Sequence, residues 1–214
     1  MVRAILSGQK TVTRRVIKPF QVPTLDDDGR WYSVAQRHPK WGFAVDGDTE
    51  RECANALAGS LCCPYGKPGD WLWVRESTES YLGLSPCKAV ELSRYCADRE
   101  SVLKTMDVAG TNIEVVDHWQ YHRRVRPSIH MPRSQCRILL EITAVRIERV
   151  QDISDDQARA EGVAEWAKGA LSPDGCAEIC RQEAFRMLWE SINGAGSWNA
   201  NPWVWVVEFK RVAA

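Results

Sequence analysis

The sequence lacks net charge, long apolar runs and an N-terminal segment typical of a secretory signal. Its 214 residues carry 28 Lys and Arg against 28 Asp and Glu, so a protein that coats nucleic acid through a uniformly basic surface is excluded. No stretch approaches the roughly 18 apolar residues of a membrane-spanning helix, which predicts no membrane contact. No apolar h-region precedes a small-residue cleavage site, so a cytoplasmic location is expected.

Closely spaced cysteine pairs are also missing, although the chain has 8 cysteines. Cys62 and Cys63 are adjacent, and Cys176 and Cys180 are four residues apart. A structural zinc site needs C-x-x-C pairs with matching partners downstream, and scattered cysteines in a cytoplasmic protein remain reduced. We therefore expect no disulfide, no structural metal and no other cofactor.

Tryptophan is the aromatic residue that the chain uses most, with 10 Trp against 5 Tyr and 4 Phe. Tryptophan anchors hydrophobic cores, and it also stacks on nucleobases. Hydrophobic residues make up 44% and charged residues 26%, which is ordinary for a globular chain. The length predicts one domain with large insertions, or at most two small domains.

The apolar pattern predicts strands with a few helices, hence the α+β class. Residues 137–150 alternate and form the clearest long strand, whereas 203–209 are apolar on both faces, as in a central strand. Ser154 and Gln157 form a capping box, and Gly162 closes the helix that they open. The other expected elements are a helix over 1–7 ended by Gly8, a hairpin around Trp31 and Tyr32, a strand over 71–76, and a helix from Ser172 to Asn193 with Phe185, Leu188, Trp189 and Ile192 as its apolar stripe. This inventory suits a small β-barrel wrapped by helices, a single domain over 1–214 with insertions at about 21–61 and 77–118.

The first basic segment is Gly8–Arg15, GQKTVTRR, in a region that has no acidic residue from Met1 to Gln21. Such a local field on a neutral chain predicts a binding surface. Its cations and those beside it are Arg3, Lys10, Arg14, Arg15 and Lys18.

The second basic segment is His118–Leu140, which also has no acidic residue. Trp119 and Tyr121 alternate with the charge, a composition typical of surfaces that track a phosphate backbone and stack bases. The basic residues that we expect to bind there are Arg123, Arg124, Arg126, His130 and Arg133. The alternative is a solvated loop whose arginines pair with acids elsewhere, such as Asp152, Asp155 and Asp156.

Several stretches together resemble the ASCH family, a branch of the PUA-like β-barrel folds, and in particular its larger phage- and prophage-encoded members. The family motif Gly-x-Lys-x-x-Thr-x-Arg is matched by Gly8, Lys10, Thr13 and Arg15. Further matches are Gly69-Asp70 leading to Glu76, the helix segment Ala158–Gly162, Trp189 on the next helix, and the closing strand from Pro202. The resemblance implies a PUA-like barrel, with the two insertions exceeding a compact ASCH domain.

Some small members of the family are amidohydrolases of N4-acetylcytidine, and the resemblance implies Lys10, Thr13 and Glu76 as the catalytic groups. A threonine hydroxyl would be the nucleophile, a lysine with a lowered pKa the base, and the glutamate its orienting partner. A ribonuclease activity at the same residues is a further alternative. Without that chemistry, Lys10 and Glu76 would form a plain ion pair and Thr13 would be an ordinary strand residue.

The function expected from these features is binding of RNA, single-stranded DNA or a modified nucleoside in a basic cleft. The residues expected to line it, beyond the second basic segment, are Arg14, Arg15, Trp73 and Trp198. Trp198 lies in a polar, glycine-containing loop and has the alternative of plugging one end of the barrel. The competing functions are a hydrolase and a phage accessory protein that binds a host protein. A phage-encoded protein would lie in the cytoplasm of the host cell.

Overall fold

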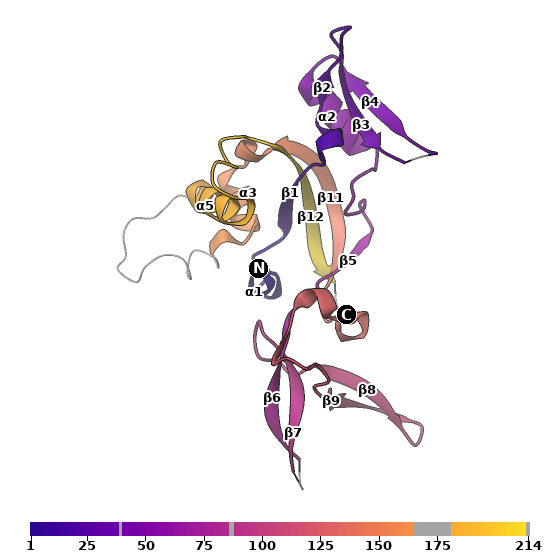
Figure 1. Cartoon of the computed structure of the whole chain (residues 1–214), viewed down its shortest axis with the longest axis vertical. Helices are drawn as coiled ribbons and strands as arrows, with labels where there is room; N and C mark the ends of the chain where they lie inside the picture. The colour runs from indigo at the N-terminus through magenta and orange to yellow at the C-terminus, as the bar shows by residue number, and fades with distance from the viewer. Residues whose placement is uncertain (39, 86–87, 165–180, 213–214) are drawn as a thin grey trace, which may run out of the picture. The chain divides into compact units, whose positions relative to one another are not determined.

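The computed structural model describes residues 1–38, 40–85, 88–164 and 181–212. The chain divides into two compact units, which are drawn together in Figure 1. The first unit consists of Met1, Arg3–Leu72 and Leu140–Arg211, and the second mainly of Trp73–Leu139. Antiparallel strands are combined with a few helices, which confirms the predicted α+β class.

A curled four-stranded antiparallel sheet in the order β1-β12-β11-β5 is the frame of the first unit. Its strands are β1 (Val12–Val16), β5 (Trp71–Trp73), β11 (Leu139–Arg149) and β12 (Trp203–Val212). The first five residues of β12 are all buried and the strand has a neighbour on each side, as predicted for a central strand. β5 is shorter than predicted: the Val74 N–H still donates to the Ile138 carbonyl, but Glu76 turns away to bind Arg137.

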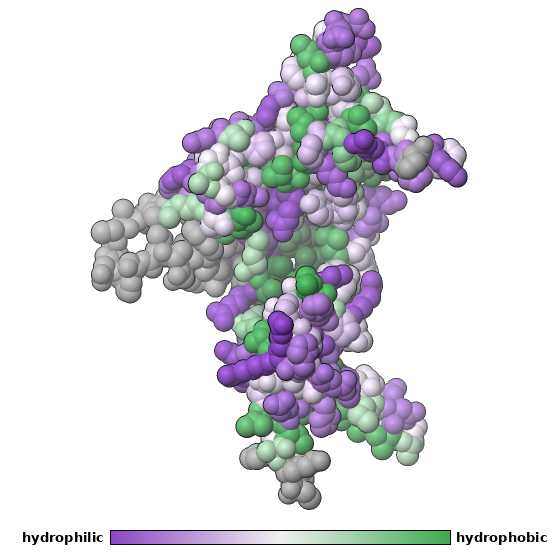
Figure 2. Space-filling model, in the orientation of Figure 1, coloured by the Kyte–Doolittle hydropathy of each residue, from purple (hydrophilic) through white to green (hydrophobic). Residues whose placement is uncertain are grey.

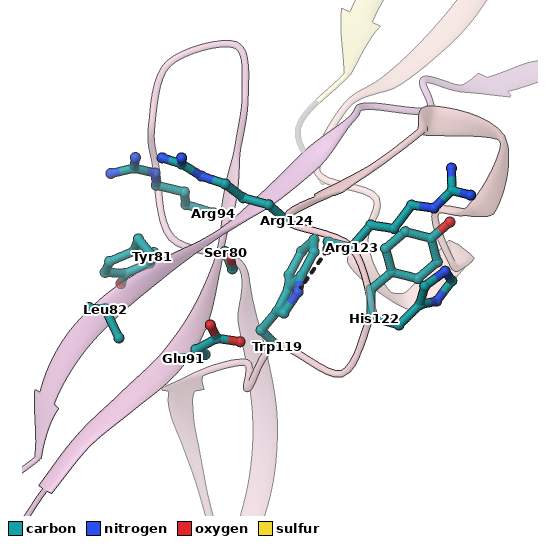
Figure 3. A pocket seen from close by; sticks show the side chains of 10 residues that line it. Ser80, Tyr81, Leu82, Glu91, Arg94, Trp119, His122, Arg123 and Arg124 are labelled. Atoms are coloured by element: carbon teal, nitrogen blue, oxygen red, sulfur yellow. Dashed lines mark hydrogen bonds between the residues drawn. The ribbon is translucent and has the colours of Figure 1, made fainter.

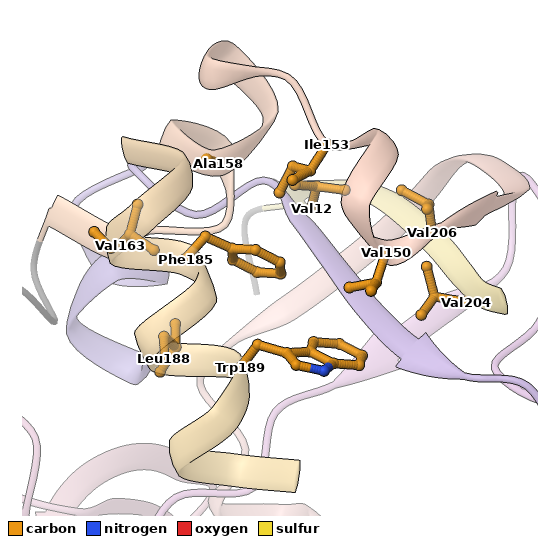
Figure 4. Packing of buried hydrophobic residues seen from close by; sticks show 11 residues of the cluster. Val12, Val150, Ile153, Ala158, Val163, Phe185, Leu188, Trp189, Val204 and Val206 are labelled. Atoms are coloured by element: carbon orange, nitrogen blue, oxygen red, sulfur yellow. The ribbon is translucent and has the colours of Figure 1, made fainter. Parts of the chain in front are cut away.

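Helices cover one face of this sheet. α5 (Arg181–Asn193) and α3 (Asp155–Ala160) lie together, and Figure 4 shows Phe185 and Trp189 of α5 directed toward the sheet. Both side chains belong to one buried cluster with Val204 and Val206 of β12. Ile192 was predicted in the same stripe, but it lies at the C-terminal end of α5 and is 56% exposed. The predicted start of this helix at Ser172 lies outside the described residues.

Local signals set the ends of the short helices. α1 (Val2–Leu6) stops before Gly8, and α3 is opened by the predicted capping box, in which Ser154 and Gln157 each accept the other's backbone N–H. Gly162 follows α3 with φ +79°, a conformation that favours glycine. A Cβ on Gly162 would lie 2.9 Å from the Cβ of Ala4, so the position also needs glycine for space.

The region 21–61 covers the other face of the sheet. η1 (Pro19–Gln21) leads into this region, which contains β2 (Thr24–Leu25), β3 (Trp31–Gln36), β4 (Phe43–Gly47) and α2 (Glu50–Gly59). The predicted hairpin is present, because β2 pairs with β3 and Trp31 faces Leu25. Sequence analysis missed β4 and α2, although Thr49 and Glu52 form a capping box that marks the start of α2. Leu57 of α2 belongs to the buried cluster that contains Trp205 of β12.

The second unit consists of two hairpins and a connecting segment. Its elements are β6 (Thr78–Ser85), β7 (Lys88–Tyr95), β8 (Leu103–Val108), β9 (Thr111–Val116), β10 (Val125–Arg126), η2 (Ser128–His130) and η3 (Arg133–Gln135). The remaining short helix, η4 (Val150–Asp152), follows β11 in the first unit. Its apolar cluster is small, with Tyr95, Val102 and Met131 buried. Figure 2 shows apolar residues at the surface of the β8–β9 hairpin, where Met106 and Val108 are exposed.

Within the described ranges, no helix is long and apolar enough to cross a membrane. Over the same residues, no three His, Cys, Asp or Glu side chains gather in a way that would hold a metal ion. The described thiols that are free are Cys53, Cys62, Cys63, Cys96 and Cys136, whereas Cys87, Cys176 and Cys180 lie outside the described part of the chain.

Candidate functional site

A pocket of about 460 Å³ lies in the second unit, where the segment Trp119–Arg124 meets β6 and β7 (Figure 3). This volume lies within the range of roughly 300–1,000 Å³ that is typical of ligand sites. The pocket is lined by Ser80, Tyr81, Leu82, Glu91, Arg94, Trp119, Tyr121, His122, Arg123 and Arg124. We call it the basic aromatic pocket.

Backbone hydrogen bonds hold both ends of the segment that forms this pocket. The Trp119 N–H donates to the Glu91 carbonyl of β7 at 3.0 Å. The Ser80 N–H of β6 donates to the Arg124 carbonyl at 2.9 Å. The segment is therefore fixed to both strands, and its side chains are presented from a defined backbone.

Trp119 is held in place from two sides. Its indole Nε1 donates to the Arg123 carbonyl at 3.1 Å, the dashed line in Figure 3. The Arg126 guanidinium lies 5.6 Å from the centre of the Trp119 ring, and Arg126 also bonds Thr78 and Gln135. Arg126 thus supports Trp119 in the structure, and its predicted binding of nucleic acid remains a prediction.

Arg123 and Arg124 are exposed, and among the described residues neither side chain has a hydrogen-bond or ion-pair partner. Figure 3 shows Arg124 directed to the same side as Arg94, and Arg123 directed to the side of His122. Arg94 differs, because Glu79 accepts from its Nε at 2.8 Å, and the same carboxylate also pairs with Arg99. The pocket thus offers two uncompensated cations, one on each side of Trp119.

The other aromatic rings are close together. The ring centres of Tyr121 and His122 are 4.7 Å apart, and those of Tyr121 and His130 are 6.1 Å apart. His130 and Arg133 are exposed, as a surface role requires. Both remain predicted binding residues.

The alternative for the second basic segment, a loop whose arginines pair with acids, applies to one arginine. Arg137 binds Glu76, Asp98 and Glu100. Of the three acids considered as partners, Asp152 pairs with Arg51 and Asp155 with Arg181.

Lys10 lies in a buried ion-pair cluster of the first unit. Its ammonium donates to Glu161 Oε2 at 2.6 Å, to the Glu161 carbonyl at 3.0 Å and to the Val12 carbonyl at 2.8 Å, so its three protons are all bound. Burial lowers the pKa of Lys10, and the charge of Glu161 opposes that change. The ion pair considered between Lys10 and Glu76 is incorrect, because the carboxylate that binds Lys10 is that of Glu161.

The two arginines of the motif have different roles. Arg14 has a fully buried side chain that bonds Glu161, Glu148 and Gln157 at 3.4, 3.2 and 2.8 Å. A phosphate would reach Arg14 only if this cluster opened. Arg15 is exposed at a smaller cavity of about 280 Å³, lined also by Tyr65, Phe185 and Trp189.

Thr13 and Arg14 are consecutive on β1, so their side chains point to opposite faces of the sheet. Thr13 is half-buried and pairs in register with Val207. The motif therefore directs its hydroxyl and its buried guanidinium in opposite directions.

Glu76 belongs to the second unit and is 1% exposed. Arg137 donates to both of its carboxylate oxygens, at 2.9 and 2.8 Å, and also lies 3.8 Å from the centre of the Tyr95 ring. Burial is the main cause that raises the pKa of Tyr95 to about 12. The prediction that Lys10, Thr13 and Glu76 line one site remains a prediction.

The two remaining tryptophans predicted to bind have structural contacts. Arg75 stacks on half-buried Trp73, with its guanidinium 4.7 Å from the ring centre. Trp198 packs against the helix-side cluster and makes an edge contact with Phe185, at a ring-centre distance of 6.1 Å. This favours the alternative in which Trp198 covers the core.

Sequence reasoning missed Glu161, Tyr81, Glu91 and Arg94. Glu161 directly precedes Gly162, so it was visible only as a helix end. The other three lie in 77–118, a region where mixed composition concealed the alternation of β6 and β7.

A scan of protein-family models found no match to the chain, and searches of curated proteins and of solved structures found none either. The chemistry of the side chains described above is therefore the basis for inferring function.

Proposed function

We propose that the protein binds single-stranded nucleic acid through the basic aromatic pocket of its second unit. The observation that carries the proposal is that Arg123 and Arg124 are exposed and uncompensated on the two sides of a fixed Trp119. Single strands are bound by cations that contact phosphates together with aromatic rings on which bases stack. The pocket combines both within one segment of the chain.

Electrostatics favours a local site over general attraction. The chain as a whole is neutral, so a phosphate backbone is attracted only where cations are uncompensated. At physiological salt that attraction is screened over about 8 Å, so Arg123 and Arg124 act on phosphates that are close to them. An acidic peptide would use the same cations but would have no use for the aromatic rings.

The proposal includes membership of the ASCH family, with the first unit as its PUA-like part. The motif residues Gly8, Lys10, Thr13 and Arg15 support it, as does a curled antiparallel sheet covered by helices. In this proposal the second unit is an insertion that carries the nucleic-acid pocket. An experimental structure with a sheet that cannot be extended to a barrel would contradict the family assignment.

Hydrolysis at Lys10 is the second candidate, and the observation that favours it is the lowered pKa of this buried ammonium. The substrate would be a modified nucleoside such as N4-acetylcytidine, or RNA in a ribonuclease reaction. Incubation of the protein with each substrate tests it, and Thr13→Ala removes the proposed nucleophile without touching the ion-pair cluster. Absence of turnover by the unaltered protein contradicts this candidate and leaves binding intact.

The binding proposal is tested with a fluorescein-labelled oligouridylate of about ten nucleotides, a length suited to single-strand binding sites, and with its DNA counterpart. We expect Arg123→Ala with Arg124→Ala to weaken binding. If each arginine contacts one phosphate, the slope of log affinity against log salt flattens by about 1.4, since one contact to a single strand contributes about 0.7.

The matched control replaces Arg37 and Arg159 by alanine and removes the same charge; both are exposed arginines of the first unit whose side chains have no partner among the described residues. We expect it to bind like the unaltered protein. Equal binding by both double variants at every salt concentration would contradict the proposal. A host protein would then become the leading partner, with the exposed apolar residues of β8–β9 as the surface to examine.

A further inference from the structure

We propose that the basic aromatic pocket selects guanine, and that Glu91 is the residue that reads the base. This inference rests on the proposed nucleic-acid function and adds a base preference to it. It predicts that a strand is held by its phosphates at Arg123 and Arg124 while one base lies against Trp119 with its edge at Glu91.

The position of Glu91 follows from the register of the hairpin. Glu91 of β7 pairs with Leu82 of β6, and directly opposed residues of an antiparallel pair project from the same face. Ser80 lies two residues from Leu82 and therefore shares that face. Figure 3 shows the Glu91 carboxylate below Ser80 and directed toward Trp119.

Glu91 is an exposed acid in a pocket that otherwise carries positive charge. Among the described residues its carboxylate has no ion-pair or hydrogen-bond partner. Arg94 of the same strand lies three residues from Glu91, so it projects from the opposite face of the hairpin, where it pairs with Glu79. The Glu91 oxygens are left to accept hydrogen bonds from a ligand.

An ionised carboxylate only accepts hydrogen bonds, through two oxygens. Among the standard bases, guanine presents two adjacent N–H donors on its Watson–Crick edge, at N1 and N2, which match a carboxylate in a bidentate arrangement. Uracil and thymine present one N–H between two carbonyl oxygens, and those oxygens would be repelled by the carboxylate. Recognition of single strands commonly combines such edge contacts with stacking of the base on an aromatic ring.

The test compares two short labelled RNA oligomers, one of uridine alone and one with a single central guanosine, by fluorescence anisotropy. We expect the guanosine oligomer to bind more tightly by roughly 5- to 150-fold, the discrimination of one good bidentate contact. Inosine at the same position lacks the N2 amine and should lose most of this gain. Replacement by 7-deazaguanosine keeps both donors and should retain it.

Glu91→Gln is the decisive variant, because it keeps the size of the side chain but replaces one acceptor oxygen by an NH2 donor. We expect it to remove most of the guanosine preference while binding to the uridine oligomer is unchanged or tighter, since a negative charge is lost. Glu114→Gln, at an exposed acid of β9 outside the pocket, is the charge-matched control and should keep the preference.

The outcomes separate this inference from the proposed function. If the unaltered protein binds both oligomers equally, or if Glu91→Gln keeps the guanosine preference, the reading role of Glu91 is refuted while nucleic-acid binding stands. If neither oligomer binds at any salt concentration, both proposals fail. Loss of the preference in Glu91→Gln but not in Glu114→Gln supports both.

Discussion

Replacement of Glu161 by glutamine should destabilise the protein strongly at neutral pH and much less at high pH. Glu161 is 4% exposed, and its carboxylate lies 2.6 Å from the Lys10 ammonium and 3.4 Å from Arg14. Glutamine has nearly the same shape but no charge. Arg14 keeps Glu148 and Gln157, so Lys10 is the cation that loses its counter-charge.

The size of the effect has an expected value and an upper limit. Removing one partner of a buried ion pair costs about 3 to 5 kcal/mol. The folded variant can also avoid a buried unpaired cation by releasing the Lys10 proton. At pH 7, about 3.5 pH units below the ordinary pKa of 10.5, that release costs about 4.8 kcal/mol, which caps the loss.

The pH dependence follows from the lowered pKa of Lys10 in the folded state. Between that pKa and 10.5 the unfolded chain binds the Lys10 proton and the folded chain does not, so stability rises with pH. In Glu161→Gln the pKa of Lys10 falls further and this rise becomes larger. At pH 9 the upper limit on the loss of unfolding free energy is about 2 kcal/mol.

Urea denaturation at pH 7 and pH 9 measures this effect, and thermal unfolding at pH 7 should show a Tm lower by roughly 6 to 20 °C. Glu141→Gln is the control, because Glu141 is half-buried and pairs with the exposed Lys210 of β12. Its loss should stay within about 1 kcal/mol. The reasoning is refuted if the two variants are equally stable, or if the loss in Glu161→Gln is the same at both pH values.

Two further predictions concern the Arg137 cluster of the second unit. Tyr95→Phe removes the hydrogen bond to the Gln135 carbonyl, which is 2.7 Å long, and should cost about 1 kcal/mol at pH 7. Because the pKa of Tyr95 is raised to about 12, the stabilisation by its neutral form is present below pH 10 and lost between pH 10 and 12. A rise of about two pKa units outweighs one hydrogen bond, so the stability advantage over Tyr95→Phe should close and then reverse over that range. A constant stability difference in urea denaturation would contradict this. Arg137→Lys cannot reproduce the two-point contact with buried Glu76 and should lower the unfolding free energy by about 1.5 to 3 kcal/mol, and unchanged stability in the same assay would show that a single cation suffices.

The sequence alone determined the features in which a residue interacts with near neighbours along the chain. Ser154 and Gln157 cap α3 across three residues, and the backbone at Gly162 has the conformation that glycine favours. The central strand β12 was readable because burial on both faces leaves no polar alternation between Trp203 and Val207. Each of these signals depends on local geometry, so no tertiary contact was needed to predict it.

Tertiary structure decided the partners of the charged residues. Lys10 and Glu161 are 151 residues apart in sequence, and Arg137 and Glu76 are 61 apart, so no spacing rule connects them. On charge alone, every carboxylate in the chain could have been the partner of either cation. The path of the backbone determines which carboxylate lies close enough to pair. Burial and neighbours on other strands depend on the whole backbone path in the same way. Arg14 is buried, although its sequence context predicts an exposed basic surface. Glu91 lies beside Trp119 because β7 pairs with the segment that contains Trp119.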